Sequence, residues 1–433
     1  MQQTVYWIWL SQAVTPGSDT FRKLLNKFEY PKAIYNADDT QLASCIGSKS
    51  RDYEALCNKD LSGAESILDF CTRKSVGILT YDDEAFPNSL REITTPPVLL
   101  YYRGILPDFN KNCFVAMVGT RRLTDYGRRN AFQIGYDLAA AGATIVSGMA
   151  IGIDGVSHAG SLAAGGINVA FLGSGIDVCY PEQHKRLARE IVKNGCVLTE
   201  YAPGVRPNGY HFPVRNRLIA GVSCATVVIE GHEKSGALIT ARHAKEFGKT
   251  VYALPGNVDN KTSAVSNMLI KNGAKLITSA DDIVEELEFV YLGIINPFNL
   301  LEKLPVRMND VLSNLEIACV SQGDKIFSTY PSKKNSAEKK EEKHFDIEPE
   351  SREITESASD EGSRIYDNIV ENVSFDKNTL RIYKKIPPTG DCNIDSLVDN
   401  DDKMPDVMKA LLKLEMGSFV IMLPGERVQR KFK

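Results

Sequence analysis

The sequence predicts an α/β protein in which a mostly parallel sheet is covered by helices on both faces. Two observations lead to this prediction. Seven short apolar runs, rich in β-branched residues, recur through the middle of the 433-residue chain, and segments with helical spacing separate most of them. Strands that alternate with helices are typical of parallel sheets, because each crossover helix packs on the sheet. We expect an all-α domain before this sheet and a small winged-helix domain after it.

The N-terminal domain is predicted to span residues 1–72. Apolar side chains such as Phe21 and Leu24 recur there at helical spacing, and short polar breaks separate the segments. The pattern then changes to two short β-like runs, at 76–80 and 98–102. The helical region therefore ends before the first of these runs.

The middle domain is predicted to span residues 73–292. Its strands are expected at residues 115–119, 144–148, 169–173, 197–199, 226–230, 251–255 and 275–278. Helices are expected between most of them, for example over 128–141 and 236–247. In such sheets ligands bind where loops leave the carboxyl ends of the strands. The loops that follow the predicted strands are therefore the candidate site.

The small net charge of −4 conceals an asymmetry along the chain. Residues 103–279 contain 20 Lys and Arg against 12 Asp and Glu, so this segment has a net charge of +8 and the remainder −12. A basic middle between acidic flanks predicts a polyanionic partner for the middle domain.

The C-terminal third divides into a linker and a small domain. Residues 293–364 are predicted to be a charged, largely disordered linker, because 17 of the 32 residues from 333 to 364 are charged and few are apolar. Residues 365–433 contain an amphipathic segment at 407–415 and a hairpin pattern over 419–428. Helices that end in a β-hairpin predict a winged-helix domain.

Several classes of protein are not expected from this sequence. The nine cysteines are at least 12 positions apart and the six histidines lack the spacing of zinc sites, so neither a disulfide framework nor a metal is predicted. No basic region precedes the apolar N-terminus, and no apolar run reaches the roughly 18 residues of a membrane span. No nucleophile motif, P-loop or carboxylate cluster is present. We expect a cytoplasmic binding protein, not an enzyme, with no cofactor and no catalytic residues.

The loop after the first predicted parallel strand combines a turn with two cations. Gly119 permits a sharp turn, and the exposed amides together with Arg121 and Arg122 can bind an anion. The alternative is a capped turn that carries two solvated arginines.

A second candidate segment places an aromatic residue beside two arginines. Phe212, Arg215 and Arg217 are spaced to share one helical face. Bases stack on aromatic rings and guanidinium groups bind phosphates, so this arrangement suits single-stranded nucleic acid. The alternative is that Phe212 belongs to the core and the arginines pair with Glu200 or Glu230.

Two further loops leave another function open. The segment GSGID, residues 173–177, matches part of a dinucleotide fingerprint but lacks its third glycine. The loop that ends at Ser235 and Gly236 precedes a predicted helix, where it can bind a phosphate or where Ser235 can simply cap the helix. A nucleotide-binding enzyme or sensor is therefore the alternative function.

Seven motifs carry a family resemblance. From residue 118 to residue 256 they are, in order, VGTRRLTDYG, SGMAIGIDGVSHAG, GSGIDVCYP, LTEYAPG, FPVRNRLIAG, SGALITA and ALPG. This order resembles the DNA-processing protein A family (DprA, also called Smf). The resemblance implies a SAM-like or helix-hairpin-helix-like N-terminal domain, an extended Rossmann-like domain that binds single-stranded DNA, and often a winged helix. It also implies protection of incoming strands in natural transformation, loading of the RecA recombinase and a homodimer formed through the Rossmann-like domain.

The resemblance assigns roles residue by residue. The family's GSR, FPxRNR and SGSLITA motifs match this chain at residues 119–121, 212–217 and 235–241. The predicted DNA-binding residues are Gly119, Thr120, Arg121, Arg122, Phe212, Arg215, Asn216, Arg217, Ser235 and Gly236. The chain departs from the family pattern at His184, where the family has Asn, and at Val265, where it has Gly.

These features predict a single-stranded DNA-binding protein that protects incoming DNA and passes it to RecA. We expect the predicted winged helix to contact a protein and not DNA, because the negative charges of its aspartates repel phosphate groups. Those aspartates are Asp391, Asp395, Asp399, Asp401 and Asp402.

Overall fold

The computed structural model describes residues 2–233, 235–300, 306–319, 377–387, 391–398, 404–416, 420–423 and 427–430. The chain divides into two units, Met1–Pro349 and Glu350–Lys433.

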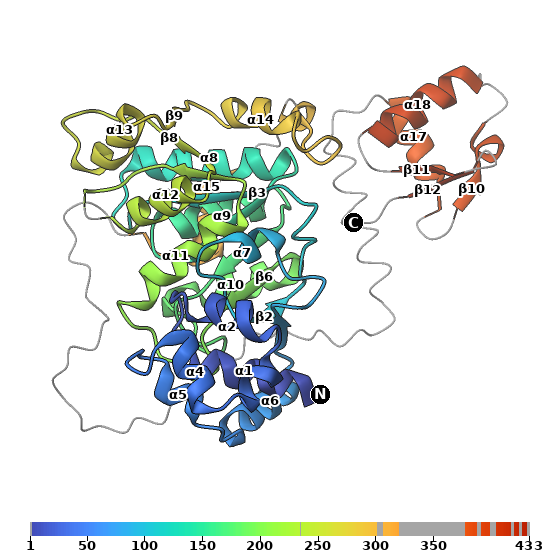
Figure 1. Ribbon diagram of the computed structural model, residues 1–433. Coiled ribbons are helices and arrows are strands. Elements are labelled where there is room, and N and C mark those ends of the chain that lie inside the picture. The colour runs from blue at the N-terminus through green and yellow to red at the C-terminus, as the bar shows by residue number, and fades with distance from the viewer. Residues whose placement is uncertain are drawn as a thin grey trace. The chain divides into compact units, whose positions relative to one another are not determined.

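The first unit begins with a group of short helices, drawn in blue in Figure 1. They are α1 (Gln2–Ala13), α2 (Thr20–Phe28), α3 (Pro31–Asn36), α4 (Asp39–Ile46), α5 (Tyr53–Cys57) and α6 (Ser62–Arg73). Local sequence sets some of their ends. Asp38 accepts a hydrogen bond from the Gln41 amide, and the Gln41 side chain accepts one from the Asp38 amide, which forms a capping box at the start of α4.

The described residues of this unit form one nine-stranded sheet in the order β1-β2-β6-β5-β4-β3-β7-β8-β9. The strands are β1 (Gly77–Thr80), β2 (Leu99–Gly104), β3 (Phe114–Val118), β4 (Thr144–Ser147), β5 (Asn168–Phe171), β6 (Cys196–Thr199), β7 (Ala225–Val228), β8 (Thr250–Ala253) and β9 (Lys275–Leu276). Neighbours from β6 to β9 are parallel, whereas β1, β2 and β6 pair antiparallel. The predicted mostly parallel sheet is confirmed.

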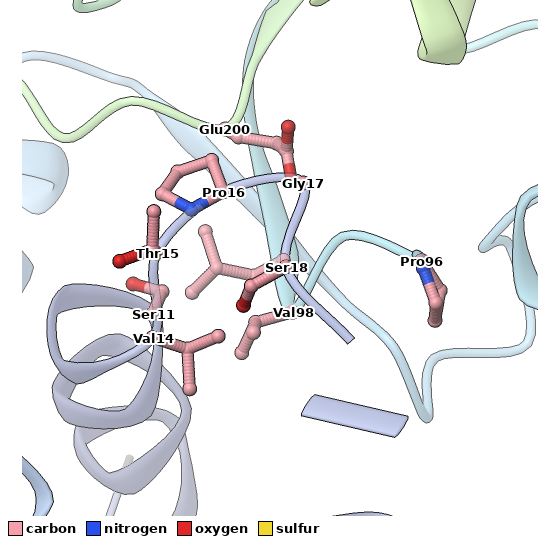
Figure 2. Close-up of a pocket in the computed structure, with 10 residues that line it drawn as sticks. Ser11, Val14, Thr15, Pro16, Gly17, Ser18, Pro96, Val98 and Glu200 are labelled. Carbon is pink, nitrogen blue, oxygen red and sulfur yellow. The ribbon is translucent and has the colours of Figure 1, made fainter. Parts of the chain in front are cut away.

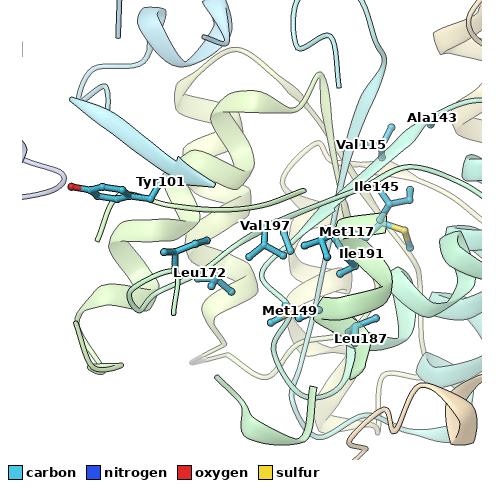
Figure 3. Close-up of a cluster of buried hydrophobic side chains, with 14 of the residues drawn as sticks. Tyr101, Val115, Met117, Ala143, Ile145, Met149, Leu172, Leu187, Ile191 and Val197 are labelled. Atoms are coloured by element: carbon cyan, nitrogen blue, oxygen red, sulfur yellow. The ribbon is translucent and has the colours of Figure 1, made fainter. Parts of the chain in front are cut away.

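Helices cover both faces of the sheet. They are α7 (Asn88–Glu92), α8 (Asp125–Ala140), α9 (Ile153–Ala163), α10 (Lys185–Asn194), α11 (His211–Val222), α12 (Gly236–Glu246), α13 (Ala264–Lys271) and α14 (Asp281–Glu288). Alternate residues of β3 enter different cores: Val115 and Met117 pack with α8, α9 and α10, whereas Ala116 packs with α11 and α12. Figure 3 shows part of the first core. The apolar runs lack an alternating polar face because both faces of the sheet are buried.

The chain reverses its direction of winding beside β3. Strands β4, β5 and β6 are added on one side of β3, and α11 then carries the chain back to β7 on the other side. At such a switch point the loops after two neighbouring strands lie side by side. The Thr120 amide, after β3, accordingly donates to the Glu230 carbonyl, after β7, at 2.8 Å.

Part of the predicted linker is folded onto the first unit. Residues 306–319 contain α15 (Met308–Asn314), and Leu312 and Leu315 in this segment are buried. Residues 301–305 and 320–364 of the predicted linker lie outside the described residues.

The second unit is a small α/β arrangement with its own core. It contains α17 (Lys377–Lys385), β10 (Asp391–Asn393), α18 (Met404–Met416), β11 (Val420–Leu423) and β12 (Arg427–Arg430). The described strands pair antiparallel in the order β10-β12-β11. Leu411, Leu414 and Val428 are buried in its core. A helix and a hairpin are thus present where the sequence predicts them, and the winged-helix identity of the unit stays a prediction.

Candidate nucleic-acid interface

The candidate site consists of the loops at the carboxyl ends of β3, β4, β5 and β7, together with the first turn of α11. We call residues 119–124, 148–152, 172–177, 229–233 and 235 the strand-end loops. The parallel direction of these four strands brings the loops to one edge of the sheet.

Glu230 fixes the shape of the loop after β3. This carboxylate is 1% exposed and accepts hydrogen bonds from the Thr124 hydroxyl at 2.5 Å and the Thr124 amide at 3.0 Å. The Thr124 hydroxyl also accepts from the Gly127 amide and so caps α8. The sequence left open that Glu230 pairs with an arginine of α11. In the structure, Glu230 instead accepts hydrogen bonds from Thr124.

The first turn of this loop is packed tightly against α9. A Cβ atom built on Gly119 would lie 2.5 Å from Cγ1 of Ile153, so only glycine fits without a shift. The Thr120 hydroxyl accepts from the Arg122 amide at 3.1 Å. The turn leaves Arg121 partly buried and Arg122 exposed.

Phe212 lies within cation–π distance of two arginines. The Arg121 Cζ atom is 5.4 Å from the centre of the Phe212 ring, and the Arg215 Cζ atom is 5.8 Å from it. A Cβ atom built on Gly173 would lie 2.9 Å from the ring, so the loop after β5 packs against it directly. The ring is partly buried. Through its contacts with Arg121 and Gly173, Phe212 connects the loops after β3 and β5 at the start of α11.

Arg215 is a buried connection between strand ends. Its Nη1 atom donates to the carbonyl of Gly148 at 2.9 Å and to the carbonyl of Phe171, and its Nε atom donates to the Asn216 side chain at 3.1 Å. A Cβ atom on Gly148 would lie 2.4 Å from the guanidinium group, so this close approach requires glycine. Arg215 therefore joins the ends of β4 and β5 to α11.

Asp154, at the start of α9, faces the same cluster. It accepts hydrogen bonds from the amides of Gly148 and Ala150, at 3.2 and 3.4 Å. Burial raises the pKa of Asp154, and the nearby positive charges of Arg215 and Arg121 oppose that rise.

Arg217 points to a different partner. Its guanidinium group forms a two-pronged ion pair with Glu200, with N–O distances of 2.8 and 2.6 Å, and both side chains are almost completely buried. Its Nε atom donates to the Thr95 hydroxyl at 3.2 Å. The pairing with Glu200, one of the two alternatives for these arginines, is thus what the structure shows for Arg217.

Asn216 connects α11 to the start of α12. Its Nδ2 atom donates to the Gly236 carbonyl at 3.3 Å. Ser235 caps α12, because its hydroxyl accepts from the Ala237 amide at 3.2 Å. Gly236 is exposed at this helix end. Nine of the predicted DNA-binding residues therefore meet around the start of α11 or in the loop after β3, whereas Arg217 faces Glu200.

One exposed aromatic residue was not among the predicted site residues. Tyr210, the residue before α11, is 84% exposed. The neighbouring His211 differs, because it stacks on Tyr201 at 4.1 Å between ring centres and burial lowers the pKa of His211. The signal for Tyr210 was present in the aromatic and basic segment YHFPVRNR.

The GSGID loop is filled by the protein's own backbone. The Gly175 amide donates to the Val205 carbonyl at 2.8 Å, and Asp177 accepts from the Gly204 amide at 2.7 Å. A Cβ atom on Gly175 would lie 2.6 Å from the Ala202 carbonyl oxygen. The backbone of residues 202–205 occupies the space beside Gly175 that a phosphate occupies in a dinucleotide site. The geometry therefore does not favour the nucleotide-binding alternative.

Figure 2 shows a small pocket elsewhere, between the loop after α1 and the sheet. It is lined by Thr15, Gly17 and Ser18 from the loop and by Glu200, the partner of Arg217.

Within the described ranges no group of three or more His, Cys, Asp or Glu side chains is placed to bind a metal. In the same part of the chain, no helix has the length and apolarity needed to cross a membrane.

Comparisons with known proteins agree with the motifs. A family model described as DNA recombination-mediator protein A matches residues 77–288. Protein Smf of Synechocystis is 36% identical over 289 residues, which cover 66% of this chain and 73% of that protein. DNA processing protein DprA of Bacillus subtilis is 36% identical over 225 residues, which cover 52% of this chain and 76% of that protein.

A solved structure gives the same result at the level of the fold. The X-ray structure of DprA from Streptococcus pneumoniae superimposes with a TM-score of 0.57 and 32% sequence identity, over 66% of this chain and 98% of that one. The resemblance predicted from the motifs is confirmed: this chain belongs to the DNA-processing protein A (DprA/Smf) family.

Proposed function

We propose that this protein binds single-stranded DNA at the strand-end loops, protects incoming strands in natural transformation and recombination, and loads the RecA recombinase. It acts in the cytoplasm as a homodimer formed through the Rossmann-like domain, and it binds DNA without chemical turnover. Membership of the family and the net charge of the middle segment support this proposal. The nine cysteines are scattered along the sequence and lack the spacing of a disulfide framework. Because disulfide frameworks are typical of secreted proteins, this pattern supports the cytoplasmic location.

The observation that carries the proposal is the pairing of cations with aromatic rings at one edge of the sheet. Arg122 is exposed, Arg121 lies over Phe212, and Tyr210 presents an exposed ring at the start of α11. Guanidinium groups bind phosphates and aromatic rings stack on bases. Bases are accessible for stacking only in a single strand, so this combination favours single-stranded over duplex DNA.

We propose two roles for seven of the ten predicted residues. In this proposal, Arg121, Arg122, Ser235 and Gly236 contact phosphates directly, and we add Tyr210 as a stacking residue. Arg215, Asn216 and Arg217 already bond to protein carbonyl and carboxylate oxygens. These three act as positioning residues that hold α11 against the strand ends.

Fluorescence anisotropy with labelled oligonucleotides of one length, single- and double-stranded, tests the proposal. The protein is expected to bind the single strand more tightly. Tyr210→Ala is expected to weaken that binding about tenfold, since stacking of one base is worth about 1–3 kcal/mol. Arg122→Glu is expected to weaken it as well, because it replaces a phosphate ligand with a repelling charge.

Lys271→Glu is the matched control. It makes the same change of charge at an exposed position at the end of α13, where the chain enters the amino edge of the sheet. Its affinity is expected to equal that of the wild type. Equal affinity for single and double strands, or equal losses in Arg122→Glu and Lys271→Glu, would contradict the proposed site.

The partner proposals have separate measurements. Sedimentation velocity is expected to give twice the 47.8 kDa chain mass. The lag before RecA forms filaments on single-stranded DNA is expected to shorten when this protein is present. A monomer at micromolar concentration contradicts the dimer, and an unchanged lag contradicts the loading role.

A further inference from the structure

A segment outside the family match lies against the strand-end loops. We call residues 306–319 the strap. The strap follows the matched residues 77–288 and contains α15, which contacts α9; Figure 1 labels both helices. Leu312 and Leu315 anchor the strap, being 7% and 9% exposed. Arg186, in α10, is 3.8 Å from Glu316 of the strap.

The end of the strap forms a closed set of hydrogen bonds with the loop between β4 and α9. The Ala318 carbonyl accepts from the Gly152 amide at 3.1 Å, and the Ala318 amide donates to His184 Nε2 at 3.0 Å. Because Nε2 accepts, the proton of the neutral ring lies on Nδ1, which donates to the Met149 carbonyl at 2.9 Å. Burial lowers the pKa of His184 and so maintains the neutral ring.

The two residues held in this way are the left-handed positions of the loop. Met149 has a φ of 53° and Gly152 a φ of 88°. A non-glycine residue in this region is strained by about 1–3 kcal/mol and persists only when its surroundings hold it. The bonds to His184 and Ala318 supply that restraint on both sides of the loop.

The shape of this loop determines where Arg121 lies. The Ile153 amide donates to the Thr120 carbonyl at 3.2 Å. A Cβ atom on Gly152 would lie 2.5 Å from that carbonyl oxygen and 2.8 Å from Cα of Arg121, so the two backbones are in direct contact. A shift of Gly152 therefore displaces the backbone of Arg121.

We propose that the strap, acting through His184, positions Arg121 for binding of single-stranded DNA. This inference rests on the proposed function. His184 stands where the family pattern has Asn, and an Asn side chain is too short to bond both Met149 and Ala318 from the same backbone position. The device therefore depends on residues of this chain that the family motifs do not include.

Hydrogen exchange of the full-length protein without DNA tests the contact itself. Leu312→Asp places a charge in the buried anchor and is expected to release the strap, so that the amides of Gly152 and Ile153 exchange faster. Ser313→Asp, at the exposed neighbouring position of α15, is the matched control and should leave both amides protected. Unchanged exchange at Gly152 in Leu312→Asp would overturn the inference.

His184→Asn is the second variant, for use if Leu312→Asp does not fold. It keeps the strap and its anchor but removes at least one of the two bonds of the ring. Faster exchange at Gly152 is again the expected result, and full protection would overturn the inference.

Affinity measurements then separate positioning from general loss of structure. Leu312→Asp is expected to weaken single-strand binding roughly fivefold or more, the lower end of usual couplings between sites. In an Arg121→Ala background the same change is expected to produce no further loss, because the residue it positions is gone. Additive losses would overturn the inference. Absence of single-strand binding by the wild type would instead contradict the proposed function, while the exchange result would still report on the strap.

Discussion

At the scale of single residues, the arginines of the strand-end region differ in what surrounds their guanidinium groups. Arg122 is exposed, whereas Arg217 is enclosed with Glu200. Removing a phosphate ligand changes affinity and little else, whereas removing one member of a buried ion pair leaves an uncompensated charge in the core. Substitution of Arg122 is therefore expected to reduce DNA affinity, whereas substitution of Arg217 is expected to reduce the stability of the fold.

Arg217→Ala is expected to lower the free energy of unfolding by roughly 3–5 kcal/mol, because Glu200 would remain buried without its partner. Urea denaturation measures this change. Arg217→Met combined with Glu200→Gln should recover part of the stability, since no buried charge remains. A variant Arg217→Ala with wild-type stability and no DNA binding would show that Arg217 contacts DNA directly.

A buried histidine predicts how stability depends on pH. His158 is fully buried, its Nδ1 atom bonds to the Asn168 side chain at 2.8 Å, and burial lowers its pKa from 6.5 to about 4. Because the unfolded chain binds the proton more tightly, stability is complete above pH 6.5 and falls as the pH decreases toward 4. The shift corresponds to a loss of about 3 kcal/mol.

Denaturation at pH 7 and at pH 4.5 measures this effect. His158→Gln removes the ionisable ring, so its stability should decrease less over the same interval than that of the wild type. If wild type and variant lose the same stability on acidification, other groups cause the loss and the prediction is wrong.

At the scale of elements, the close packing of α8 on α9 depends on glycines. A Cβ atom on Gly160 of α9 would lie 2.2 Å from the Phe132 carbonyl oxygen of α8, and one on Gly135 would lie 2.6 Å from the Ser157 carbonyl oxygen. These helices precede and follow the loop that contacts Arg121, so their separation also affects the site.

Gly160→Ala is expected to destabilise the protein by about 1–3 kcal/mol, because the helices must move apart to admit the methyl group. Gly63→Ala, in the exposed first turn of α6, has only the Gln12 side chain nearby, at 3.6 Å, and is the control. It should leave stability unchanged or raise it by at most about 1 kcal/mol. Thermal unfolding of both variants checks the contrast, and equal effects would contradict it.

At the scale of the whole molecule, the basic segment of the chain lies within a single unit. The net charge of +8 lies in residues 103–279, which belong to the first unit, and the remainder of the chain is acidic. Phosphate binding is therefore expected from the first unit alone.

Residues 1–349 are expected to bind single-stranded DNA within about twofold of the full chain, since separate units make largely independent contacts. The slope of log K against log salt should be the same for both proteins. Arg122→Glu should reduce that slope by roughly 0.7, the value for one phosphate contact with a single strand. A loss of affinity greater than tenfold on removal of residues 350–433 would show that the second unit contacts DNA.

The sequence by itself determined the mostly parallel sheet and the loops that form the candidate site. Strand and helix periodicities are local, and every predicted parallel strand is present within two residues of its expected ends. The ordered motifs, such as FPVRNR, also identified the family before any fold was known.

Only the tertiary structure decided which of the site residues face solvent and which bond to protein. Arg215 and Arg217 are two positions apart in one motif, but one meets backbone carbonyls of Gly148 and Phe171 and the other meets Glu200. The bonds of His184 to Met149 and Ala318 likewise join residues 35 and 134 positions away. Periodicity reports only neighbours along the chain, whereas the partner of a buried polar group is set by whichever distant backbone the fold brings within hydrogen-bond distance.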